Sequence, residues 1–157
     1  MNTLKIGRGR IELHEWSLAE AVINSLIKFG EERGVASIEE VEVTYGEIME
    51  LEVSIFETAF EQLSKGTPLE GTKLVLKEEK AKFKCNACGA EWDFETVERI
   101  LSDEFSVVEE PHGTRESPLH FLPQLAPALL KCPSCGSRDF DLTSGKGMRI
   151  SKVVVKT

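Results

Sequence analysis

The sequence predicts an α+β protein, a small domain of two helices on a three-stranded mixed sheet, with a second domain inserted ahead of the last strand. Two segments repeat apolar residues at helical spacing, and three others have the composition of strands. All four cysteines lie in two Cys-x-x-Cys motifs between the second and third predicted strands. The expected first domain comprises residues 1–81 and 146–157, and the inserted domain comprises residues 82–145.

The first helix is expected over residues 17–33. Its apolar residues recur at steps of three and four, as Leu18, Val22, Leu26 and Phe29. Ser17 followed by Glu20 matches a capping box, in which the two side chains satisfy amides at the start of a helix. Gly34 stands where the residue after a helix C-terminus falls. The pattern therefore predicts both ends of this helix.

A second helix is expected over residues 53–64, ahead of Gly66. Its apolar face is formed by Ile55, Phe56, Ala59, Phe60 and Leu63. Strands are expected over residues 41–45, 73–77 and 148–155, where β-branched and apolar residues dominate or alternate with polar ones. Two strands do not cover two helices well, so the last segment is expected to complete the sheet. This order leaves the cysteines in an insertion.

Composition and charge narrow the classes of function. A net charge of −8 argues against a nucleic-acid partner, because phosphate binding relies on Lys and Arg. No apolar run approaches the roughly 20 residues that a membrane span needs, and the N-terminus lacks the apolar core of a secretory signal, so cytoplasmic residence is expected. We find no phosphate loop and no Ser-His-Asp or Cys-His spacing, and we expect that the protein is not an enzyme.

The four cysteines have the spacing of a zinc ribbon. Cys85 and Cys88, and likewise Cys132 and Cys135, are separated by two residues, which lets each pair reach one tetrahedral ion. A glycine follows each second cysteine and permits a positive φ, so that amides can point at the sulfurs. Strands are expected just before each motif, at residues 82–84 and 129–131. Residues 106–123, rich in proline and charge, are expected to form a long loop.

Zinc is the favoured ion for this site. Iron in a rubredoxin-like site is an alternative, because four cysteines do not by themselves choose between the two metals. Two disulfides are a weaker alternative, since they need an oxidising compartment that nothing else in the chain supports. With four thiolates around the ion no position is open to substrate or water, so the zinc is expected to be structural.

Further motifs add a resemblance to a known family. His14-Glu15-Trp16 lies before the first predicted helix, and Gly46-Glu47 follows the first predicted strand. Together with the segments Phe83-Lys84-Cys85-x-x-Cys88-Gly89 and Cys132-Pro133-x-Cys135-Gly136-Ser137, they resemble the hydrogenase nickel-incorporation metallochaperones (HypA type). The resemblance covers nearly everything from Leu13 to the C-terminus, with the elements in the same order.

The resemblance implies a nickel site at His14 in the first domain. His14 would supply an imidazole ligand, the backbone amides of His14 and Glu15 would be further donors, and the Glu15 side chain would lie beside the ion. Nitrogen donors in a square plane suit Ni(II). Twelve residues precede Leu13, so the free terminal amine that the family uses is not at this place. The resemblance also places His120 near the nickel, although the residues alone favour a loop histidine packed against Phe121.

The implied function is that of a nickel metallochaperone that binds Ni(II) and delivers it during maturation of nickel-iron hydrogenase. Zinc would be structural and nickel would be transported. The implied partners are a nucleotide-hydrolysing nickel-chaperone partner and the hydrogenase large subunit. The alternative is a zinc-ribbon adaptor or regulatory protein-interaction module without a nickel role. That alternative explains the cysteines but leaves the His-Glu-Trp motif unexplained.

Overall fold

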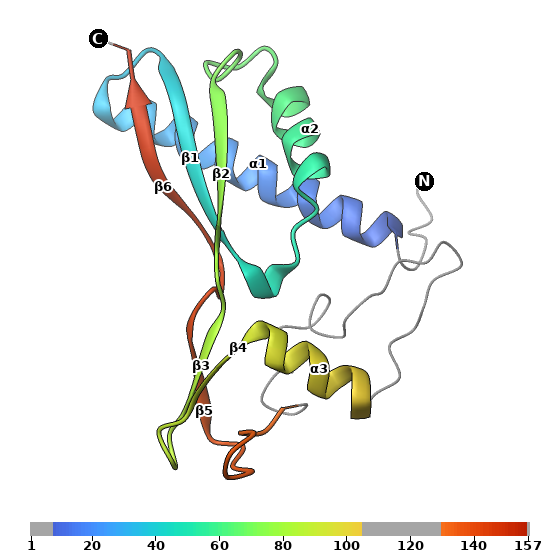
Figure 1. The fold of residues 1–157 in the computed structure, drawn as a ribbon. Coiled ribbons are helices and arrows are strands. Elements are labelled where there is room, and N and C mark those ends of the chain that lie inside the picture. The colour runs from blue at the N-terminus through green and yellow to red at the C-terminus, as the bar shows by residue number, and fades with distance from the viewer. Residues whose placement is uncertain (1–7, 105–129, 157) are drawn as a thin grey trace. The chain divides into compact units, whose positions relative to one another are not determined.

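The computed structural model describes residues 8–104 and 130–156 (Figure 1). Its helices are α1 (Arg8–Arg33), α2 (Val53–Ser64), α3 (Phe94–Glu104) and the 3-10 helix η1 (Glu47–Met49). Its strands are β1 (Ile38–Gly46), β2 (Lys73–Glu79), β3 (Lys82–Cys85), β4 (Glu91–Asp93), β5 (Phe140–Ser144) and β6 (Met148–Val155). None of the helices in the described residues is long and apolar enough to cross a membrane.

The chain forms two compact units, each with a three-stranded sheet. The first unit contains the described residues of 1–44, 51–77 and 149–157, and the second contains the described residues of 45–50 and 78–148. The sheets have the strand orders β2-β1-β6 and β4-β3-β5. The predicted α+β class is confirmed. Residues 45–50 lie outside the insertion predicted from the sequence, and they belong to the second unit because Ile48 is buried in its core.

The core of the first unit lies between its two helices and the central strand. Its buried apolar side chains come mostly from three elements and include Ala19, Val22, Ile23 and Leu26 of α1, Val41 and Val43 of β1, and Phe56, Ala59 and Phe60 of α2. Helix α2 has the predicted bounds, and β6 has the bounds predicted for the last strand. The apolar periodicity thus identified Val22 and Leu26 of α1 and Phe56, Ala59 and Phe60 of α2, whereas Leu18 and Phe29 of the predicted face are only half-buried and Ala19 was not predicted.

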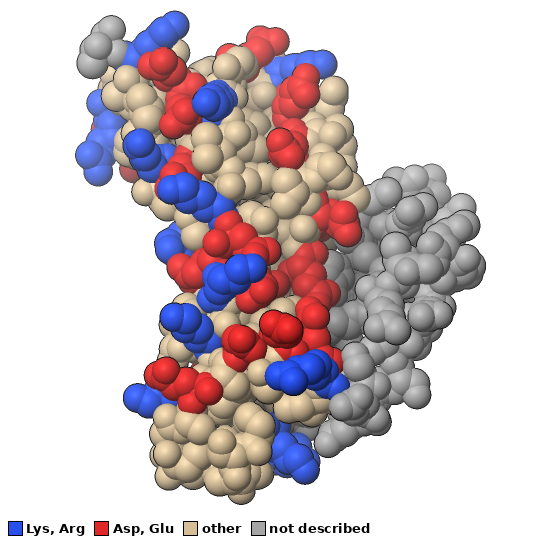
Figure 2. Space-filling view, in the orientation of Figure 1, with Lys and Arg blue, Asp and Glu red and all other residues tan. Residues whose placement is uncertain are grey.

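Strands β1 and β2 run parallel. Two ion pairs join them, Lys73 Nζ to Glu40 Oε1 at 3.6 Å and Lys77 Nζ to Glu42 Oε1 at 3.0 Å. Residue numbers therefore rise in the same direction along both strands. The crossover between them carries α2, as a parallel pair requires. On the face drawn in Figure 2, Lys and Arg side chains lie among Asp and Glu side chains.

Strand β6 runs antiparallel to β1. The Lys156 N–H donates to the Ser37 carbonyl at 3.2 Å, whereas the hydroxyls of Thr44 and Ser151 lie 2.8 Å apart, so residue numbers fall along β6 as they rise along β1. Thr44 is buried, and the Ser151 hydroxyl gives it a polar partner. With one parallel and one antiparallel pair, this is the mixed sheet that the sequence predicts.

The predicted start of the first helix is wrong. Helix α1 begins at Arg8, so Ser17 and Glu20 are exposed residues inside it and form no capping box. His14 correspondingly lies within α1 rather than before it. The buried face of α1 extends back from Ala19 to Glu15, one helical turn earlier, and apolar periodicity could not register a glutamate on that face. The predicted C-terminal glycine, Gly34, does have a positive φ of 67°.

The internal position of Ser17 gives a prediction. Ser17→Ala is expected to raise the free energy of unfolding by roughly 0.5 kcal/mol, because alanine has the higher helix propensity at an exposed position. A capping serine would instead lose about 1 kcal/mol on the same change. Urea denaturation measures the difference. Ser25→Ala, at another exposed position of α1, is the control and is expected to behave alike. A loss of stability at Ser17 alone would contradict the position of the helix start.

The second unit is built around β3, which pairs antiparallel with both β4 and β5. Phe83 on β3 is fully buried, and its ring stacks on Trp92 with centroids 5.6 Å apart, while Phe140 meets both rings edge to face. Ile48, Phe94, Val97 and Leu130 are buried in the same cluster.

Two local features of the second unit differ from expectation. Helix α3 was not predicted, although Asp93 gives a signal for it, since its Oδ1 accepts the Thr96 N–H at 2.9 Å at the helix start. The strand expected before the second cysteine motif is absent at Leu130 and Lys131, which have no regular structure. The long loop expected over residues 106–123 lies outside the described residues.

Three backbone segments of the second unit approach closely at Gly46, Ala81 and Gly145. A Cβ on Gly46 would overlap the carbonyl of Gly145, and a Cβ on Gly145 would lie 2.5 Å from the Ala81 Cα. The Ala81 N–H donates to Glu47 Oε1 at 2.9 Å. Both residues of the Gly46-Glu47 motif therefore take part in this close packing. The lack of a Cβ at these glycines is what permits the approach.

Candidate metal centre

Each cysteine motif forms a tight turn that directs two sulfurs the same way. In the first, the Cys85 N–H donates to the Ala90 carbonyl at 2.8 Å and the Gly89 N–H donates to the Cys85 carbonyl at 3.0 Å. Gly89 has a φ of 77°, a conformation that costs glycine little. The Cys88 N–H also lies 3.5 Å from the Cys85 sulfur, within reach of an N–H···S hydrogen bond. Strand β3 therefore ends in a turn with both thiols at its tip.

The second motif repeats this geometry. The Cys132 N–H donates to the Ser137 carbonyl at 2.8 Å, and the Gly136 N–H donates to the Cys132 carbonyl at 2.9 Å. Gly136 has a φ of 75°, close to that of its counterpart in the first turn. The Ser134 N–H lies 3.4 Å from the Cys132 sulfur. The two turns are thus equivalent in backbone hydrogen bonds, as the repeated sequence predicts.

The four sulfurs come together as a single cluster. Cys85 Sγ lies 3.6 Å from Cys135 Sγ, and Cys88 Sγ lies 3.6 Å from Cys132 Sγ. All four sulfurs lie within 4.8 Å of one another. Ligands about 2.3 Å from a tetrahedral ion are about 3.8 Å apart, so the cluster fits such an ion. A disulfide needs about 2.0 Å, and all four cysteines are free, which contradicts the disulfide alternative.

The cluster combines buried and exposed thiols. Cys85 and Cys132 are each 1% exposed, whereas Cys88 and Cys135 are exposed. Burial opposes ionisation of the Cys132 thiol, but the backbone N–H groups of Cys135 and Ser134 lower its pKa to about 7. The pKa of Cys85 is also lowered, chiefly by the backbone N–H of Cys88. Amides directed at sulfur favour the thiolate, the form that binds a metal.

Two of the three predicted nickel residues, His14 and Glu15, lie in the described part of the chain, and they form no metal-binding cluster with other residues there. His14 is exposed on α1, and Glu15, next to it, is fully buried, with Oε2 accepting the Glu52 N–H at 2.6 Å. His120 lies outside the described residues. Within residues 8–104 and 130–156, the four cysteines are the one group of three or more His, Cys, Asp or Glu side chains close enough to hold a metal.

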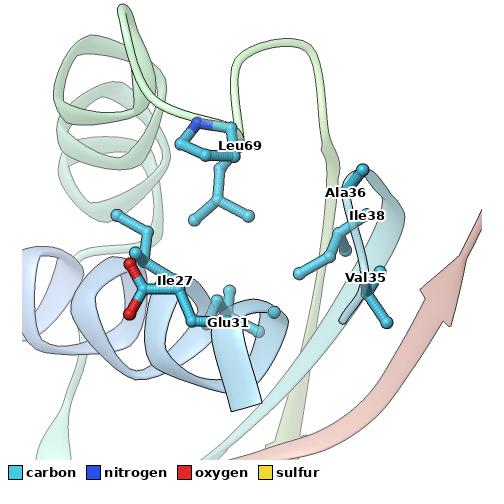
Figure 3. Close-up of a pocket in the computed structure, with 9 residues that line it drawn as sticks. Ile27, Glu31, Val35, Ala36, Ile38 and Leu69 are labelled. Carbon is cyan, nitrogen blue, oxygen red and sulfur yellow. The ribbon is translucent and has the colours of Figure 1, made fainter. Parts of the chain in front are cut away.

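A pocket in the first unit is distinct from the cysteine cluster. Its volume is about 160 Å³, and it lies between the C-terminal half of α1, the start of β1 and the loop after α2. Figure 3 shows Ile27 and Glu31 of α1 facing Val35, Ala36 and Ile38, with Leu69 above them. Glu31 is the one charged residue in the lining, so the pocket lacks the ligands of a metal site.

Comparisons with known proteins agree on one family. Residues 13–155 match the family model described as "Hydrogenase/urease nickel incorporation, metallochaperone, hypA". The hydrogenase maturation factor HypA of Pyrococcus furiosus is 33% identical over 144 residues, which cover 92% of this chain and 96% of that protein. The factor of the same name from Thermococcus onnurineus is 34% identical over 149 residues, with the same coverage.

Solved structures share the fold at lower identity. The solution structure of the Ni metallochaperone HypA from Helicobacter pylori matches with a TM-score of 0.54 at 19% identity, over 90% of this chain and 96% of that chain. A second solution structure, titled as HypA protein, matches with a TM-score of 0.56 at 19% identity, over 92% and 97% of the two chains. At this identity the likeness concerns the fold alone.

Proposed function

We propose that this chain, which belongs to the HypA family of hydrogenase/urease nickel-incorporation metallochaperones, binds Ni(II) and delivers it during the maturation of nickel-iron hydrogenase. The observation that carries the proposal is the family match over residues 13–155, which spans both units and begins one residue before His14. The relatives that match along nearly their whole length are named hydrogenase maturation factors. Nickel would then be the cargo of the protein, and its binding site is the point to test.

His14 is the side chain that we propose as a nickel ligand. It is exposed on α1, so an ion can reach its imidazole from solvent. The backbone amides of His14 and Glu15 are less accessible, because amides in the second turn of a helix bond to carbonyls four residues earlier. Coordination by these amides requires the start of α1 to unwind. His120 remains a proposed neighbour of the ion.

His14→Ala is expected to weaken Ni(II) binding at least about tenfold, since the variant lacks the one imidazole proposed as a direct ligand. Calorimetric titration measures the change in protein whose cysteines are first loaded with zinc, so that nickel does not bind the thiolates. Glu20→Ala, at an exposed position of the same helix, is the control and is expected to bind as the unaltered chain does. Unchanged binding by His14→Ala would refute the assignment of the ligand.

The same titration tests the function. The unaltered chain is expected to bind Ni(II) at micromolar concentration or below, and so is a protein that begins at Leu13, which offers a terminal amine beside His14. Binding by neither protein would refute the nickel role. It would favour the zinc-ribbon adaptor, for which the cysteine cluster alone suffices.

The cysteine cluster is proposed to hold a structural Zn(II). Cys85, Cys88, Cys132 and Cys135 would bind it as thiolates, and the fit of their sulfurs to a tetrahedral ion supports this assignment. Zinc supplies a cross-link there without redox chemistry, whereas iron in the same ligands would bring a redox couple. Metal analysis of reduced protein distinguishes the two, and about one zinc per chain is the expected result.

We assign the two proposed metal sites to the two domains predicted from the sequence. Residues 1–81 and 146–157 would bind nickel, and residues 82–145 would bind zinc. Delivery implies two partners, a nucleotide-hydrolysing nickel-chaperone protein and the hydrogenase large subunit. We propose a cytoplasmic location for this exchange, because four free cysteines that are close enough to share one metal ion suit a reducing compartment. Co-purification of either partner with the zinc-loaded protein tests this part of the proposal.

A further inference from the structure

Helix α1 carries a buried glutamate where its apolar face predicts an apolar residue. Glu15 lies four residues before Ala19, on the face that continues through Val22 and Leu26 towards α2 and the sheet. Its exposed fraction is 0%. Burying a carboxyl group costs free energy unless it makes hydrogen bonds, so the position of Glu15 calls for a structural explanation.

The contact of Glu15 with α2 supplies that explanation. Glu15 Oε2 accepts the N–H of Glu52, the N-cap residue of α2, at 2.6 Å, and Glu52 makes no capping bond with its own side chain. In a capping box the N-cap N–H is satisfied by a Glu or Gln three residues later, but that position holds Ile55. Glu15, a residue of α1, therefore accepts the N-cap N–H of α2, which is usually accepted by a residue of α2 itself.

We propose that Glu15 is a positioning residue, which fastens the turn of α1 that carries His14 to the start of α2 and so presents the imidazole to nickel. The proposal rests on the proposed function. It reassigns Glu15 from beside the ion to the interface between two helices. Through this contact, the position of His14 is tied to α2, although the two residues in the hydrogen bond are 37 positions apart in the chain.

The geometry separates Glu15 from the ion that His14 would bind. Consecutive residues of a helix point about 100° apart around its axis, at 3.6 residues per turn. His14 is exposed whereas Glu15 is buried, so their side chains leave α1 towards solvent and towards α2 respectively. While α1 keeps its observed structure, His14 is therefore available as a ligand and Glu15 is held in the contact with α2.

Two substitutions at Glu15 test the proposal. Glu15→Ala removes the acceptor, whereas Glu15→Gln keeps an oxygen that can accept the Glu52 N–H. For Glu15→Ala we expect hydrogen exchange of the Glu52 amide to accelerate about tenfold and Ni(II) affinity to fall about tenfold, as for partners that orient a metal ligand. The visible absorption spectrum of bound nickel is expected to stay the same. Glu15→Gln is expected to restore both the exchange rate and the affinity.

Each other outcome overturns the positioning role. If Glu15→Gln weakens nickel binding as much as Glu15→Ala and changes the nickel spectrum, Glu15 is a ligand. If Glu15→Ala speeds exchange but leaves the affinity unchanged, its contact with α2 is structural only. Should Glu15→Ala fail to fold, the affinity and spectrum of Glu15→Gln decide between the first outcome and the proposal. Failure of the unaltered chain to bind Ni(II) refutes the proposed function and, with it, the inference.

Discussion

Cys132→Ser is expected to abolish zinc binding and to unfold the second unit. Serine replaces a buried thiolate by a hydroxyl, which is a poor zinc ligand at neutral pH. The strands of this unit have only three to five residues, so little besides its aromatic cluster would hold it together without the metal. Structural zinc contributes an apparent ~10–16 kcal/mol in small zinc-dependent domains, against about 5–15 kcal/mol for the stability of a whole domain.

The loss is measured by NMR through the indole N–H signal of Trp92, which is 8% exposed and stacks on Phe83. In Cys132→Ser this signal is expected to move to the position of an unfolded chain, and the zinc content to fall below about 0.1 per chain. Ser134→Ala is the control: it lies in the same turn, and only its backbone N–H approaches the Cys132 sulfur, so zinc and signal are expected to persist. A Trp92 signal at its folded position in metal-free protein would show that the second unit folds without the metal.

The two cysteine turns were predictable from the sequence because their determinants are local. The two residues between the cysteines and the glycine after them fix the turn at Cys85 and at Cys132, and each turn satisfies its own amides. Helix α2 and strand β6 were predictable for a similar reason, since apolar periodicity and β-branched residues are properties of short segments. The local structure of these segments could therefore be predicted.

Other than the meeting of the two cysteine motifs, side-chain contacts between distant segments could not be predicted. Glu15 binds an amide of α2, and nothing near Glu15 in the sequence indicates that partner. Ser17 and Glu20 have the spacing of a capping box, but local spacing does not reveal that the helix continues through them to Arg8. Ile48 likewise follows the first predicted strand, yet it is buried with Phe83 and Trp92. The consequence for the proposed nickel ligand is that His14 lies in a helix, which only the structure indicates.

Gly145→Ala is expected to lower the free energy of unfolding of the second unit by about 3 kcal/mol. Gly145 has a φ of 80°, which costs an alanine roughly 1–2 kcal/mol, and the new Cβ would lie 2.5 Å from the Ala81 Cα and 2.6 Å from its nitrogen. Both are backbone atoms, so the clash is relieved only by moving a chain segment, at a further ~1–3 kcal/mol. The shift also disturbs the Gly145 N–H, which donates to Glu79 Oε1 at 2.8 Å.

Gly136→Ala separates the conformational cost of a positive φ from the steric cost of the clash. Gly136 has nearly the same φ, 75°, in the same unit, but a Cβ there would meet nothing within 4 Å. It is therefore expected to lose only the conformational part, about 1 kcal/mol, with its N–H to the Cys132 carbonyl retained. Urea denaturation of zinc-loaded protein, followed at Trp92, measures both variants. Equal losses would mean that Ala81 moves aside freely and that the close approach of the segments at Gly145 contributes nothing. A loss at Gly145 larger by about 2 kcal/mol assigns that difference to steric contact between the two backbone segments.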